Sequence, residues 1–196
     1  MKVQEYYDKK ASTYNLEKTH GFLSRFVQRE QEVLQRFLDI QKGDSVLDVG
    51  CGEGFYSRLI REKGGEPFGV DISPGMIASY RREGFEGAVL DIVESGVDRK
   101  FHKVFCGGSL EFTSNPELAL RHMSQSLEMG NSLVLLYPRL NPGGLLYRLY
   151  HLSHGMWIHL FSDQRITAML HRSDLEIVSL EKPTFFAGVI KAKKSK

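Results

Sequence analysis

Residues 45–54, with the sequence SVLDVGCGEG, constrain the fold of this chain more than any other stretch. A short, mostly apolar run suited to a buried strand is followed by glycines at positions 50, 52 and 54, and then by a segment of helical character, 55–63. Glycine lets the backbone turn sharply and approach a ligand where a Cβ would collide. The start of a helix offers free N–H groups to a polar ligand. The stretch therefore predicts a strand, turn and helix with a small-molecule site at the turn, as in open α/β sheets.

Predicted strands and helices alternate along most of the chain. We expect strands at 45–49, 66–71, 87–91, 101–106, 132–137, 176–180 and 185–191. We expect helices at 24–38, 55–63, 74–83, 116–130 and 163–172, with Ser73-Pro74 and Asn115-Pro116 as two of the helix starts. Such alternation is typical of βαβ units in a mostly parallel sheet with right-handed crossovers.

Length and composition indicate one globular domain spanning residues 1–196, with 41% hydrophobic and 26% charged residues. No apolar run approaches the ~20 residues of a membrane-spanning helix, and residues 1–5 lack the apolar core of a signal peptide. We therefore expect a cytoplasmic protein. The two cysteines, Cys51 and Cys106, read as buried thiols, and no ligand spacing suggests a metal. The net charge of +2 includes four lysines in 191–196, which we expect to form a solvated, frayed terminus.

The glycine-rich turn does not fit the common nucleotide motifs. Phe55 stands where the dinucleotide pattern G-x-G-x-x-G needs its last glycine, and no Lys-Ser/Thr pair follows as in a P-loop. Asp48, just before the glycines, is a poor neighbour for a pyrophosphate but suits a cationic amine. In these residues the chain resembles the class I S-adenosylmethionine-dependent methyltransferases, whose first motif is an acid followed by G-x-G-x-G.

The resemblance extends to the acids that close the next two predicted strands. It implies that Asp71 holds both ribose hydroxyls and that Asp91 accepts a hydrogen bond from the adenine amino group. It implies a Rossmann-like, doubly wound α/β fold with a seven-stranded, mostly parallel sheet, its last strand antiparallel, and helices on both faces. The residues that it assigns to S-adenosylmethionine, and to the product S-adenosylhomocysteine, are Tyr14, Asp48, Gly50, Cys51, Gly52, Asp71, Ile72, Met76, Asp91, Ile92, Gly107 and Gly108.

The acceptor of the methyl group is predicted only by class. Residues 1–40 are expected to form a helical cover, and 139–162 a lid insertion beside the acceptor. Because this insertion is apolar and aromatic, we expect a small apolar or amphipathic acceptor, such as a quinone ring or a lipid-linked head group. The catalytic residues are unknown; the candidates are His151, His154 and Tyr14, and the alternative is that these histidines face water on a helical lid.

Other functions stay open at this point. One alternative is a non-catalytic module that binds S-adenosylmethionine or S-adenosylhomocysteine as a sensor or partner subunit. Another is a nicotinamide or nucleotide-sugar enzyme, for which Asp48 would be incidental. No interleaving of aromatic and basic residues supports a nucleic-acid partner. Peripheral contact with a membrane and the oligomeric state are left undecided.

Overall fold

The computed structural model describes residues 4–5, 8 and 24–195. Its strands are β1 (Ser45–Val49), β2 (Glu66–Asp71), β3 (Glu86–Val89), β4 (Phe101–Gly107), β5 (Leu127–Pro138), β6 (Leu175–Glu181) and β7 (Ala187–Lys194). Its helices are α3 (Ser24–Leu38), α4 (Phe55–Glu62), α5 (Pro74–Arg82), a 3-10 turn η1 (Leu110–Phe112), α6 (Pro116–Gln125), α7 (Pro142–Ser153) and α8 (Asp163–His171).

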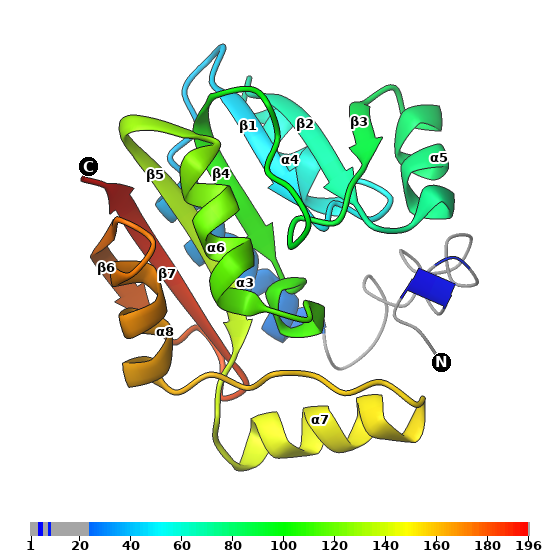
Figure 1. Ribbon diagram of the computed structural model, residues 1–196, viewed down its shortest axis with the longest axis vertical. Coiled ribbons are helices and arrows are strands. Elements are labelled where there is room, and N and C mark those ends of the chain that lie inside the picture. The colour runs from blue at the N-terminus through cyan, green and yellow to red at the C-terminus, as the bar shows by residue number, and fades with distance from the viewer. Residues whose placement is uncertain (1–3, 6–7, 9–23, 196) are drawn as a thin grey trace.

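The described strands form one seven-stranded sheet in the order β3-β2-β1-β4-β5-β7-β6. β7 runs antiparallel to both of its neighbours, and the pairings among β1 to β5 are parallel. Figure 1 shows α6 and α8 in front of the sheet and α3 behind it. This is the Rossmann-like α/β fold that the sequence predicts, and the prediction of its class is confirmed.

Burial on both faces explains why the central strands are apolar throughout. Along β1, Leu47 packs with the α6 and α8 side of the sheet, whereas Val46 packs with α3 and α4 on the other side. The predicted helix starts are also confirmed. Ser73 accepts a hydrogen bond from Met76 N, and Asn115 accepts one from Leu118 N, each with proline at the first helical position.

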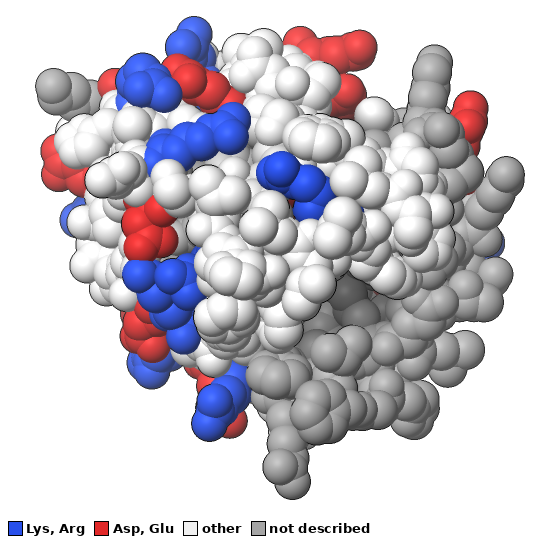
Figure 2. All heavy atoms as spheres, turned by 90° about the horizontal axis from the view of Figure 1, so that it is seen from below, with Lys and Arg blue, Asp and Glu red and all other residues white. Residues whose placement is uncertain are grey.

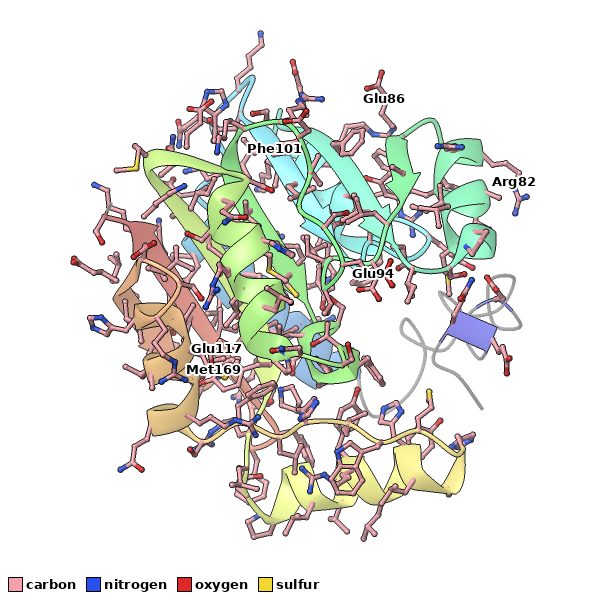
Figure 3. The ribbon with its side chains drawn as sticks, viewed as in Figure 1. Arg82, Glu86, Glu94, Phe101, Glu117 and Met169 are labelled. Carbon is pink, nitrogen blue, oxygen red and sulfur yellow. The ribbon has the colours of Figure 1, made fainter. Side chains whose placement is uncertain are left out.

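The strand order reverses direction between β1 and β4, which are neighbours although distant in sequence. In open α/β sheets, ligands bind at such a switch point, beyond the carboxyl ends of the strands. Figure 3 labels a residue at each end of the strands. Glu86 begins β3 at the amino ends, and Glu94 follows β3 on the side where the carboxyl ends lie, which we call the carboxyl edge. Gly50 and Gly107 both lie at the carboxyl edge.

Two of the expectations about local structure are wrong. The helix predicted to continue to residue 130 ends at Gln125, because Leu127 joins β5 opposite Phe101 and Gly130 has a φ of +75° that no α-helix contains. The lysines at 191–194 are not a frayed terminus but lie in β7, between β5 and β6. The Lys194 ammonium donates to the carbonyl oxygens of Ser124 and Leu127 at 2.7 and 3.0 Å.

Residues 139–162 contain α7, which Figure 1 shows below the sheet and apart from its layers. Asn141 caps this helix by accepting a hydrogen bond from Gly144 N. Within the described part of the chain, no helix has the length and apolar character needed to cross a bilayer. Half of the predicted cover at 1–40 lies outside the described residues, whereas α3 packs against β5 and β7.

Candidate functional site

A cavity of about 290 Å³ lies at the carboxyl ends of β1, β2 and β4. This is close to the lower end of the range, about 300–1,000 Å³, that small-molecule sites occupy. Its described walls come from four segments that follow successive strands, together with Gln4. The walls include Gly50, Cys51, Gly52, Asp71, Ile72, Met76, Asp91, Ile92, Gly107, Gly108, Ser109 and Phe112. The first cavity thus brings together nearly all of the predicted cofactor residues that the structure describes.

The turn after β1 is built from glycines because it is crowded. Gly50 has a φ of +72°, and a Cβ placed on it would lie 2.2 Å from the Ser109 Cβ, an overlap that no packing accommodates. The Ser109 hydroxyl donates to the Val49 carbonyl at 2.9 Å. The glycine turn and the turn after β4 are therefore locked together at the floor of the first cavity.

Asp71 closes β2 with its carboxylate in the wall of the first cavity. One carboxylate oxygen accepts from Gly52 N at 3.0 Å, and the other accepts from Ser73 N at 2.9 Å. Burial raises the pKa of Asp71 above its ordinary value, and these backbone hydrogen bonds oppose that rise. The carboxylate is thus held in one orientation, between the glycine turn and the start of α5.

Asp91 lies two residues beyond the end of β3 rather than within it. Its Oδ1 accepts from Val93 N at 2.8 Å, an interaction that fixes the side chain in the loop after β3. Leu90 and Ile92, on either side of it, also line the first cavity. Asp91 and Asp71 therefore face one cavity, separated by apolar walls that suit a flat ring.

Asp48 is buried beneath the glycine turn. It is 1% exposed and accepts a hydrogen bond from the Ser57 hydroxyl at 2.6 Å, and that hydroxyl lies 2.7 Å from the Tyr80 hydroxyl. It does not belong to the described walls of the first cavity. These contacts tie β1 to α4 and α5, beneath the glycine turn. A role beside the cofactor's amine stays a prediction.

A second cavity, of about 200 Å³, adjoins the first. The two share Tyr56, Gly107 and Gly108 as walls. A Cβ on Gly107 would lie 2.4 Å from the Phe105 ring. The wall between the cavities therefore has glycine at this position because a side chain would not fit. The remaining described walls of the second cavity are Glu30, Glu111, Leu136, Tyr137, Pro138, Tyr147, Phe186 and Ala187.

Neither of the candidate histidines, His151 and His154, is among the described walls of the two cavities. His151 is buried against the rings of Tyr147 and Phe112, at centroid distances of 4.5 and 5.1 Å. His154 is half-buried, with its Nδ1 2.9 Å from the Tyr150 carbonyl oxygen. Tyr14 lies outside the described residues. Catalytic roles for these three stay predictions, and no cluster of His, Cys, Asp or Glu among the described residues could hold a metal.

The sequence interpretation missed the carboxylate of Glu111. This side chain is 2% exposed and lines the second cavity, and its Oε1 would lie 3.8 Å from a Cβ on Gly108. The available signal was an acid between Leu110 and Phe112, directly after the turn that follows β4. An acid enclosed by apolar neighbours at the carboxyl edge of a parallel sheet is a candidate site residue.

Both cysteines are buried, as the sequence predicts. Burial raises the pKa of Cys51 well above its ordinary value, aided by the charges of Asp48 and Asp71. Burial likewise raises the pKa of Cys106 to about 12. Because the thiolate is the reactive form, we expect Ellman's reagent at pH 8 to modify neither thiol in the native protein and both in urea. A thiol that reacts within seconds in the native protein would contradict this.

Comparisons with known proteins agree with this geometry. A family model described as "Methyltransferase domain" matches residues 20–180. The ribosomal RNA large subunit methyltransferase E of Brachyspira hyodysenteriae is 35% identical over 94 residues, 46% of each chain. The ubiquinone biosynthesis O-methyltransferase of Hahella chejuensis is 24% identical over 160 residues, covering 73% of this chain and 67% of that protein. The chain spans less than half of the length of several of the curated relatives it matches.

Among solved structures, magnesium protoporphyrin IX methyltransferase of Synechocystis, described with bound SAH, superposes with a TM-score of 0.77. The sequence identity is 16%, and the match covers 98% of each chain, so this likeness concerns the fold. The family model, in contrast, covers well over half of the chain and includes both cavities' glycine-rich walls. The chain belongs to the methyltransferase domain family.

Proposed function

We propose that this protein transfers the methyl group of S-adenosylmethionine to a small apolar or amphipathic acceptor. The observation that carries the proposal is the meeting of two cavities at Tyr56, Gly107 and Gly108. One cavity has the acids and the glycine turn that suit the cofactor, and the other is a separate chamber for an acceptor. Two reactants held on either side of Gly107 and Gly108 can approach closely, because these glycines place no side chain between them.

The first cavity fits S-adenosylmethionine in its chemistry. Asp71, held by two backbone N–H groups, presents a carboxylate suited to a ribose diol, and Asp91 presents an acceptor suited to an adenine amino group. Ile72, Met76 and Ile92 supply apolar walls for the base. When bound, the cofactor supplies a methyl group made electrophilic by its positively charged sulfur. The homologous structure described with SAH supports the same assignment.

The second cavity fits an acceptor that is largely apolar but carries a hydrogen-bond donor. Tyr56, Leu136, Pro138 and Phe186 supply apolar and aromatic surface, and Glu111 adds a buried carboxylate. Since carboxylates repel phosphates, this chamber is poorly suited to a nucleic-acid backbone. The match to an O-methyltransferase of ubiquinone biosynthesis is in keeping with an amphipathic acceptor of this kind.

With the cofactor bound, the second cavity would present the acceptor's lone pair to the methyl carbon, and sulfur would keep the electron pair of the carbon–sulfur bond. The acceptor's proton leaves to water or to a carboxylate such as Glu111. The walls of the two cavities orient both reactants and exclude water, and α7, within 139–162, contributes Tyr147 to the acceptor side. We also assign the reaction to the cytoplasm, and the pair of buried free thiols supports that location.

Cofactor binding is expected to stabilise the protein measurably. S-adenosylhomocysteine at one hundred times its dissociation constant should add about 2.7 kcal/mol to the free energy of unfolding. For a domain of this size, that raises the melting temperature by roughly 5–10 °C. NAD at the same concentration serves as the control, because a nicotinamide enzyme would respond to NAD instead. Differential scanning calorimetry with each ligand makes the comparison.

Transfer itself is tested with S-adenosylmethionine labelled in its methyl group. We expect label to move from the cofactor to an organic-soluble metabolite when the purified protein is incubated with fractionated cell extract. Boiled protein is the control. Cofactor binding without labelling of any fraction would favour the alternative, a non-catalytic sensor or partner subunit.

A further inference from the structure

The outward side of α7 exposes a row of apolar side chains. They recur at helical spacing and are Leu145, Leu146, Leu149, Tyr150 and Leu152. Leu146 and Leu149 are 65% and 60% exposed, whereas His151 and Gly144, on the inward side, are buried. Exposed apolar residues are ordinary when they are scattered, but a contiguous row on one helix marks a contact surface.

Neighbouring segments extend this row into a continuous face. Phe185 and Phe186 pack against the start of α7, where their rings leave no room for a Cβ on Gly143. Trp157, 60% exposed, carries the guanidinium of Arg148 over its ring at 4.6 Å. We call the surface formed by these side chains and Leu140 the α7 face. It holds nine of the twelve large exposed apolar residues in the described chain, namely Leu140, Leu145, Leu146, Leu149, Tyr150, Leu152, Trp157, Phe185 and Phe186.

Residues 139–162, which supply most of the α7 face, carry charge of one sign. Residues 139–162 contain no Asp or Glu, but they contain Arg139, Arg148 and three histidines. Figure 2, which views the molecule from this side, shows a broad, largely uncharged area with charged groups of both signs mainly along its left and upper margins. A helix that exposes leucine and tyrosine side chains, with Trp157 and Arg148 beside them, is suited to the interface of a bilayer with anionic head groups.

We propose that the α7 face docks on the surface of an anionic bilayer. The aromatic and leucine side chains would enter the head-group region, and Arg148 would extend along Trp157 to reach lipid phosphates. A second copy of this chain is a poorer occupant. A twofold dimer through this face would bring the arginines of both copies into one interface with no acid from 139–162 to pair them.

Docking in this orientation would place the acceptor cavity beside the membrane. Tyr147 of α7 and Phe186 line the second cavity and also belong to the segments that build the α7 face. An amphipathic acceptor could then pass from the bilayer into the cavity without crossing water. This route rests on the proposed function, whereas docking itself does not.

The test is co-sedimentation with vesicles of phosphatidylcholine alone and of phosphatidylcholine mixed with phosphatidylglycerol. We expect the wild-type protein to pellet with the mixed vesicles and to be released as salt screens the charges. The double variant L146E/L149E should bind them more than about tenfold more weakly, because each leucine loses its apolar burial. The matched variant M129E/V178E adds two charges at exposed apolar positions outside the α7 face and should bind as the wild type does.

Three results would overturn the proposal. They are failure of the wild type to pellet with mixed vesicles, equal binding to both compositions, and equal binding of the two variants. A dimer that L146E/L149E abolishes, without vesicle binding, would assign the α7 face to a second copy instead.

Calorimetric titration with S-adenosylhomocysteine separates this test from the proposed function. Both folded variants should bind S-adenosylhomocysteine as the wild type does. If the wild type binds vesicles but not S-adenosylhomocysteine, only the proposed function is refuted.

Discussion

Gly50→Ala is expected to lower the free energy of unfolding by about 2–5 kcal/mol, the sum of backbone strain and overpacking. The added Cβ would lie 2.2 Å from the Ser109 Cβ, at a residue whose φ is +72°. Ser109 cannot withdraw freely, because its hydroxyl is bonded to the Val49 carbonyl. Relief of the overlap must therefore separate the turns after β1 and β4, and S-adenosylhomocysteine binding should be lost as well. Urea unfolding and calorimetric titration provide the two measurements.

Gly43→Ala is the matched control for this variant. Gly43 has a φ of +85°, close to that of Gly50, but a Cβ on it would meet nothing within 4 Å. Its substitution should cost only the left-handed backbone strain, about 1–2 kcal/mol, and leave ligand binding intact. If the two variants lose equal stability, then the crowding between the two turns contributes nothing, and the glycine turn is constrained by its backbone conformation alone.

The parts of the fold and site that could be predicted are those with local signals. The Asp48–Gly54 turn, the capped start of α5 at Ser73, the acid that ends β2 and the acid just after β3 can each be recognised from a few neighbouring residues. Parallel connectivity then brings those local signals to one edge of the sheet. The resemblance to the methyltransferases assigned Asp71 and Asp91 to one ligand, and both line the first cavity.

The parts that could not be predicted depend on contacts between distant segments. The second cavity takes Glu30 from α3, Tyr137 from β5 and Tyr147 from α7, and no short stretch of sequence shows these together. β5 extends back to Leu127 because Phe101 pairs with it, although Gly130-Asn131 reads as a turn. Lys191 and Lys193 look like a basic tail, but the strand pairs of β7 with β5 and β6 hold them in the sheet.

Asp71→Asn is expected to weaken the binding of S-adenosylmethionine by about 1–3 kcal/mol, or roughly 5–150-fold, the scale of hydrogen bonds to a charged group. An asparagine has one acceptor oxygen where the carboxylate has two, and both oxygens already hold Gly52 N and Ser73 N in place. Glu94→Gln is the control, since it removes the same charge from an exposed site near the cavity but outside its walls. Equal affinities of the two variants would mean that the ribose is held elsewhere.

The pH dependence of binding gives an independent signature of the same carboxylate. Burial raises the pKa of Asp71, so that protonation begins at a higher pH than for an ordinary aspartate. A raised pKa also means that the ionised form opposes folding above that pKa, an unfavourable effect that disappears as the pH falls through it.

Only the ionised form of Asp71 offers both oxygens to a ribose diol. Affinity for S-adenosylhomocysteine should therefore decrease on acidification in the wild type and in Glu94→Gln, with an onset above the normal range of aspartate. The Asp71→Asn variant, which has no proton to gain there, should lack this decrease, and a decrease of the same size in that variant would assign the titration to another group.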